Sequence, residues 1–73
     1  MSKELAFLIF CIEEYRFEKK LSGKNVIELF NKYHVCEYIK KFYECLHTTG
    51  PKYIINDIDI YLQARGYVSN QGV

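Results

Sequence analysis

Two histidines and two cysteines form a symmetrical array, His34-x-Cys36 and Cys45-x-His47, of residue types that bind zinc. A helix through this segment would separate Cys36 from Cys45 by about 13 Å, too far for one tetrahedral ion. Side chains two positions apart on a helix also diverge by about 200°, so Cys45 and His47 would not form a thiolate–imidazole pair. We therefore predict no metal site, two cysteines that pack between helices and two half-exposed histidines.

The paired acids, Asp57 with Asp59 and Glu13 with Glu14, are the candidates for acid–base catalysis. That chemistry requires two carboxyl groups that converge on one cleft, whereas such close neighbours on a helix diverge. The sequence has no glycine-rich phosphate loop, no serine nucleophile elbow and no His-x-x-x-His pair. We therefore predict that the protein is not an enzyme, has no catalytic residue and uses no cofactor.

The composition is that of a small globular domain. The 73 residues are 49% hydrophobic and 26% charged, with a net charge of +1 that is low for a nucleic-acid binder. Three cysteines, an odd count without a Cys-x-x-Cys pair, indicate a reducing cytoplasm rather than a disulfide framework. The longest apolar run, residues 5–12, is far shorter than the about 20 residues of a membrane-spanning helix. We expect a cytoplasmic protein without a membrane or export segment.

Hydrophobic periodicity and helix boundary signals predict the fold class. We expect an all-α, compact bundle of four helices, over residues 2–20, 23–33, 35–47 and 51–65. Ser2 and Ser22 are expected N-caps, Pro51 an expected first helical residue and Gly66 an expected C-terminal glycine. No glycine or proline separates the second and third helices, so one continuous helix over 23–47 is the alternative. A turn near residues 32–34 is favoured, because histidine is enriched in the left-handed conformation among residues other than glycine.

The first and last predicted helices carry more apolar surface than one core-facing stripe uses. The first is apolar all round, with a main stripe expected at Leu5, Leu8, Ile9, Ile12 and Arg16. The stripe of the last is expected at Ile54, Ile55, Ile58, Tyr61 and Leu62. We expect one domain, residues 1–66, followed by a flexible tail, residues 67–73. In so short a chain four helices cannot cover every apolar face of the first and last helices.

Exposed apolar surface usually marks a binding site for another protein. We therefore predict a protein partner or a homodimer, bound by the apolar residues outside the main stripes and by one polar loop. The predicted partner-binding residues are Phe7, Phe10, Phe17, Tyr53, Ile60, His47 and Thr48.

Several short motifs resemble those of a small bacterial family of helical domains of unknown function. They are F-x-x-F-C-I-E-E-Y at 7–15, L-S-G-K-x-V-x-x-L-F at 21–30, Y-I at 38–39, L-H-T at 46–48 and D-I-D-x-Y at 57–61. The family is often encoded beside domains resembling ADP-ribosyltransferases. The resemblance implies an antitoxin-like or accessory role, and it adds interest to the loop at His47 and Thr48.

The sequence thus predicts a small protein–protein interaction module, and the resemblance implies that it is an antitoxin-like or accessory partner of an ADP-ribosyltransferase-like protein. The alternative is a helix-turn-helix type DNA-binding regulator, with residues 35–47 in the major groove. The outer face of that helix mixes Lys40 and Lys41 with Glu37 and Glu44, and it lacks a base-reading set of side chains. We therefore expect neither nucleic-acid nor membrane binding.

Overall fold

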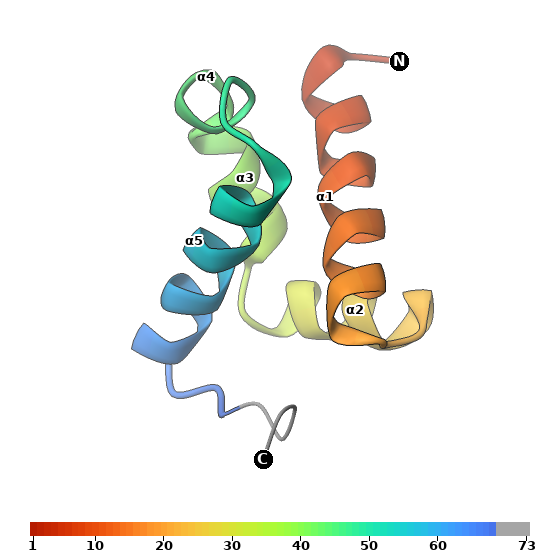
Figure 1. Cartoon of the computed structure of the whole chain (residues 1–73), viewed down its shortest axis with the longest axis vertical. Coiled ribbons are helices and arrows are strands. Elements are labelled where there is room, and N and C mark those ends of the chain that lie inside the picture. The colour runs from red at the N-terminus through yellow and green to blue at the C-terminus, as the bar shows by residue number, and fades with distance from the viewer. Residues whose placement is uncertain (69–73) are drawn as a thin grey trace.

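The computed structural model describes residues 1–68, and this part of the chain is helical without a strand (Figure 1). The predicted compact all-α bundle is confirmed. The predicted flexible tail covers residues 67–73, of which 69–73 lie outside the described residues. The helices are α1 (Lys3–Lys19), α2 (Gly23–Lys32), α3 (Val35–Lys41), α4 (Tyr43–Leu46) and α5 (Pro51–Ala64).

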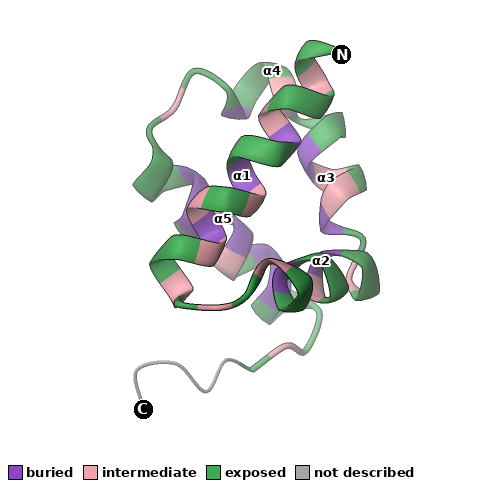
Figure 2. Ribbon diagram, turned by 90° about the vertical axis from the view of Figure 1, so that its right-hand side faces the viewer, coloured by how far each residue is buried: buried purple, intermediate pink, exposed green. Residues whose placement is uncertain are grey.

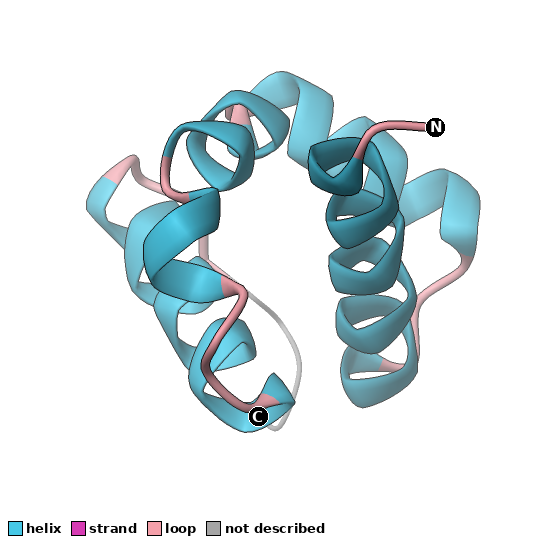
Figure 3. Ribbon diagram, turned by 90° about the horizontal axis from the view of Figure 1, so that it is seen from above, coloured by secondary structure: helices cyan, strands magenta, loops and turns pink. Residues whose placement is uncertain are grey.

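The helices enclose one core between α1 on one side and α3 with α5 on the other (Figures 1 and 3). The chain descends through α1, crosses one end of the bundle in α2, ascends through α3 and descends again through α5 (Figure 1). The molecule measures 35 × 22 × 22 Å. In so small a bundle every long helix keeps one face on the surface.

The N-termini of the long helices form as their capping residues predict. The Ser2 hydroxyl accepts a hydrogen bond from the backbone N–H of Leu5 at 3.1 Å, and Ser22 accepts one from Asn25 at 3.1 Å. Pro51 occupies the first turn of α5, where its missing N–H costs no helical hydrogen bond. The local sequence therefore determines where these three helices begin.

Three helix ends use the left-handed backbone conformation. His34 (φ 61°) and Gly66 (φ 90°) adopt it as predicted, and Lys20 (φ 57°) adopts it without having been predicted. The N–H of Leu21 donates to the carbonyl of Arg16 at 3.0 Å, which closes α1 in the Schellman pattern usual for glycine. Lys20 is therefore a residue with a Cβ in a position that favours glycine.

Replacing Lys20 by glycine is expected to raise the free energy of unfolding by about 1 kcal/mol. The left-handed conformation costs a residue with a Cβ about 1–2 kcal/mol, and glycine's larger unfolded-state entropy offsets part of that gain. Urea denaturation followed by circular dichroism measures the difference. Glu28→Gly, an exposed position inside α2, is the control and should lower stability by about 1 kcal/mol. Equal or lower stability of Lys20→Gly would contradict the prediction.

The helix predicted over residues 35–47 is divided at Phe42. This residue has φ −104° and ψ 23°, and its carbonyl accepts from the N–H groups of both Cys45 and Leu46. Beyond this bend α4 is a single turn that buries Leu46 and brings the Tyr43 ring to 5.4 Å from Phe7 of α1. No glycine or proline marks the division, so it was not visible in the sequence.

The core confirms the predicted stripe of α5, all five of whose residues are buried, but corrects that of α1. Leu8, Cys11 and Tyr15 are the buried residues of α1, while Leu5 and Ile9 are exposed, and Figure 2 shows buried and exposed residues alternating along this helix. The prediction was right for Leu8 and for Ile12, which packs against the core, and wrong for Leu5 and Ile9, because a helix that is apolar all round does not specify its rotation. The hydrogen bond from the Tyr15 hydroxyl to Asp59 of α5, at 2.8 Å, ties down the observed rotation.

Candidate partner-binding surfaces

The first surface lies on α1 opposite the core and comprises Leu5, Ala6, Ile9 and Phe10; it is called the α1 outer face. All four residues are exposed, with 44% of Ile9 and 41% of Phe10 accessible to solvent. Apolar side chains at i and i+4 form a continuous patch on a helix. Phe17, 79% exposed, lies on the same helix beyond Glu13, which bonds Arg16 at 2.9 Å.

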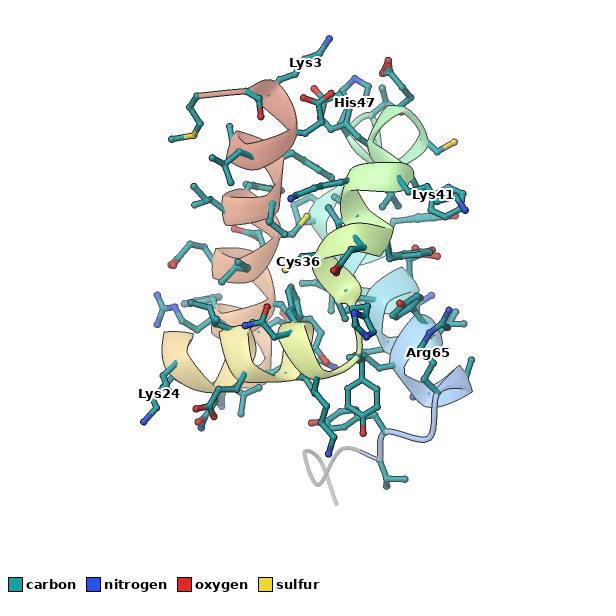
Figure 4. All side chains as sticks on the ribbon, turned by 180° about the vertical axis from the view of Figure 1, so that it is seen from behind. Lys3, Lys24, Cys36, Lys41, His47 and Arg65 are labelled. Carbon is teal, nitrogen blue, oxygen red and sulfur yellow. The ribbon has the colours of Figure 1, made fainter. Side chains whose placement is uncertain are left out.

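A row of aromatic rings extends from α1 to α4. Phe10 stacks near Phe7 with centroids 6.2 Å apart, Phe7 meets the Tyr43 ring edge-on at 5.4 Å, and Tyr43 stacks on His47 at 4.3 Å. Lys3 and His47 lie at the same end of the molecule (Figure 4), and the Lys3 ammonium is 5.9 Å from the Tyr43 ring centre. The structure thus connects the predicted residues Phe7, Phe10 and His47 through Tyr43, which the sequence analysis missed.

The polar loop after α4 begins at this row. The His47 Nδ1 atom lies 2.8 Å from the carbonyl oxygen of Tyr43, and the Thr49 hydroxyl donates to the carbonyl of Leu46 at 2.7 Å. Thr48 is exposed between them. The spacing of Tyr43 and His47, four residues within a predicted helix, is the signal that would have connected them.

The second surface lies between α3 and α5 and comprises Tyr38, Phe42, Tyr61, Lys41 and Arg65; it is called the α3–α5 face. The Tyr38 ring lies 4.3 Å from Tyr61 and 5.0 Å from Phe42. The guanidinium carbon of Arg65 lies 3.6 Å from the centre of the Tyr61 ring, and the Lys41 ammonium is 5.6 Å from the centre of the Phe42 ring. Lys41 and Arg65 project from the same side of the molecule (Figure 4).

A shallow hollow of about 480 Å³ opens on the α3–α5 face, and His34 and Glu37 complete its lining. Partial burial and the hydrogen bond to Asp57 raise the pKa of Tyr38 to about 12, and the nearby Tyr53 adds to the rise. The tyrosine is therefore neutral at physiological pH. The other two predicted residues, Tyr53 and Ile60, are exposed on α5 at 53% and 56%.

The two aspartates of α5 contact different helices. Asp57 accepts a hydrogen bond from the Tyr38 hydroxyl at 2.5 Å, whereas Asp59 accepts from Tyr15 at 2.8 Å and from the Lys19 ammonium at 2.6 Å. The acids thus diverge, and each bonds a tyrosine of a neighbouring helix. The sequence predicted that these acids diverge but did not indicate their tyrosine partners, whose hydrogen bonds hold α5 to α1 and α3.

The thiols of Cys11, which is buried, and Cys36, which is half-buried, are unreactive. Burial, with a smaller effect of Glu14, raises the pKa of Cys11 to about 12, and burial also raises the pKa of Cys36. Both are therefore protonated thiols at neutral pH. Over residues 1–68 no group of three or more His, Cys, Asp or Glu side chains is placed to hold a metal ion. No helix described here is long and apolar enough to cross a membrane.

The profile of a family described as "Protein of unknown function (DUF3791)" matches residues 6–65. The chain belongs to this family. The resemblance to a family of unknown function is thereby confirmed. The DUF3791 region contains most of the α1 outer face, the rings of the aromatic row and the whole α3–α5 face. No curated protein and no solved structure matches the chain.

Proposed function

We propose that this DUF3791 protein is a small protein–protein interaction module that binds its partner through the α3–α5 face. The observation that carries the proposal is the packing of Arg65 and Lys41 on the rings of Tyr61 and Phe42 beside an open hollow. Tyrosine, phenylalanine and arginine are the residues enriched in protein interfaces, and tyrosine and arginine dominate binding hot spots.

The chemistry of the α3–α5 face supports a partner segment that carries a carboxylate next to an apolar side chain. Within residues 1–68 the Arg65 side chain makes one hydrogen bond, 3.3 Å to the Tyr61 carbonyl, so no other described residue occupies the rest of its five N–H donors. The exposed ring of Phe42 lies beside them for an apolar contact. A carboxylate between Arg65 and Lys41 would form charge-assisted hydrogen bonds at the rim of an apolar contact.

The partner that we propose is an ADP-ribosyltransferase-like protein, toward which this chain would act as an antitoxin-like or accessory subunit. The support is the resemblance to a family often encoded beside such domains. A non-enzymatic role agrees with the aspartates, which bond tyrosines rather than converging on a cleft. The alternative, a helix-turn-helix type DNA-binding regulator, stays a prediction that no contact in the structure favours.

Phe42→Asp and Arg65→Glu are each expected to weaken binding to a co-encoded ADP-ribosyltransferase-like protein by at least about tenfold. Isothermal titration calorimetry with the purified partner measures the affinity, and circular dichroism checks that the helices persist. Arg65→Glu leaves the core intact, so its effect does not depend on folding. Ile27→Asp, an exposed substitution on α2, is the control and should leave affinity unchanged. Unchanged affinity of both test variants would refute the α3–α5 face as the binding site.

A further inference from the structure

We propose that the α1 outer face binds the same face of a second copy of this chain, with the two α1 helices antiparallel. This inference goes beyond the proposed function, because it assigns a different surface and a different occupant. It follows from three features of α1: the positions of its exposed apolar residues, the small side chain of Ala6, and the positions of its charged residues.

The patch has two short sides. Leu5 and Ile9 lie one turn apart along one side, and Ala6 and Phe10 lie one turn apart along the other. The middle of the patch is therefore level with the peptide between Phe7 and Leu8. The buried residues Leu8, Cys11 and Tyr15 face the opposite way, so the patch is free of the core.

A twofold axis through that midpoint, perpendicular to α1, makes the patch complementary to itself. Leu5 of one copy then lies beside Ile9 of the other, and Ala6 lies beside Phe10, so both pairs occur twice. The small Ala6 side chain allows the helices to approach to the about 8 Å at the close end of helix packing. The Phe10 ring fills the space beside it.

The charges of α1 favour the antiparallel arrangement. At 1.5 Å per residue, Lys3 lies about 7 Å before the midpoint on the Phe10 side, and Glu13 lies about 8 Å after it near the middle line of the patch. The rotation therefore brings Lys3 of one copy level with Glu13 of the other, twice, and the Lys3 ammonium would leave the Tyr43 ring to reach this carboxylate. Glu13 bonds Arg16 through one oxygen, so its carboxylate still has acceptor capacity. A parallel pair would instead place each charge against its own copy and align the helix dipoles unfavourably.

The size of the patch sets the expected affinity. It covers less than about two turns of one helix, so it is smaller than the about 800 Å² that each partner buries in a standard interface. We therefore expect a reversible dimer with a dissociation constant on the order of 10–100 µM.

Sedimentation velocity from about 5 to 500 µM is the test, and the unmodified chain is expected to shift from monomer to dimer over this range. Ile9→Asp should weaken the dimer by at least about 30-fold, because a charge would replace the apolar contact in both copies. The matched control Ile27→Asp, with 48% exposure against 44% for Ile9, should leave it unchanged. A chain that stays monomeric at the highest concentration, or a dimer insensitive to Ile9→Asp, would overturn the proposal.

A charge reversal tests the register. Lys3→Glu is expected to weaken the dimer by about fivefold, since two exposed pairs are reversed at once, and adding Glu13→Lys should restore it. A double variant that stays as weak as Lys3→Glu would refute the antiparallel pairing. If the chain is monomeric and Ile9→Asp abolishes binding of the ADP-ribosyltransferase-like protein, the dimer through the α1 outer face is refuted. The proposed role as a protein–protein interaction module is not refuted by that result.

Discussion

Replacing Phe30 by alanine is expected to remove most of the stability of this protein. Phe30 is fully buried in α2, and its ring lies 5.5 Å from that of Tyr15, the other aromatic side chain with almost no exposure within residues 1–68. Truncating a buried phenylalanine typically costs about 3–5 kcal/mol, through lost apolar burial and the cavity left behind. A domain of this size has little more than that in total.

Thermal unfolding followed by circular dichroism tests this expectation. The midpoint should fall by roughly 15–30 °C, or the helical signal should be lost at room temperature. Phe17→Ala is the matched control: Phe17 is 79% exposed, so the same truncation should change the midpoint by only a few degrees. A fall of less than about 5 °C for Phe30→Ala would mean that the core does not depend on this ring.

Raising the pH above about 9 is expected to unfold the protein progressively, through groups buried in their neutral forms. Burial raises the pKa of Cys11 from 9.0 to about 12. Burial and the hydrogen bond to Asp59 raise the pKa of Tyr15 well above its ordinary value of 10.0, and Tyr38 rises to about 12. In the unfolded chain these groups release their protons at the ordinary values, whereas in the folded chain they retain them.

The sign of the effect follows from proton linkage. The stability contributed by these groups is complete below pH 9 and is lost as pH rises, because the unfolded state then binds fewer protons than the folded state. Each pH unit between 9 and 12 costs about 1.4 kcal/mol from Cys11, and the tyrosines add to this above pH 10.

Urea denaturation at pH 8, 9.5 and 11 measures the alkaline loss of stability. Tyr15→Phe and Cys11→Ala should each flatten the decline, because each removes a group that ionises on unfolding. Phe17→Ala, which alters an exposed side chain without an ionisable group, should leave the slope unchanged. A stability that stays constant from pH 8 to 11 would contradict the burial of these groups.

The two proposed surfaces would work together. If α1 holds a second copy, the dimer presents two α3–α5 faces, and a partner that carries two acidic segments would bind more tightly through both. Ile9→Asp would then reduce this gain without altering the affinity of a single site. Comparing a monomeric with a dimeric partner fragment would separate the two contributions.

Local features that depend on few neighbours were predictable. The serine hydroxyls at 2 and 22, proline at 51 and glycine at 66 act within one helical turn, so they indicate the same boundaries in the sequence as in the structure. The five buried residues of α5 form the denser of its apolar stripes, and this stripe is the one that faces the core. Local hydrogen-bonding geometry and helical apolar periodicity were sufficient for the all-α fold.

Tertiary contacts decided the rest. The rotation of α1, the bend at Phe42 and the bonds of the two aspartates depend on residues distant in the chain, such as Tyr15 with Asp59 and Tyr38 with Asp57. The same contacts decided which apolar residues remain exposed, and therefore which surfaces are available to a partner. The sequence predicted an excess of apolar helix surface, but several rotations of an all-apolar helix bury similar area, so only the packed structure could show which part lies outside.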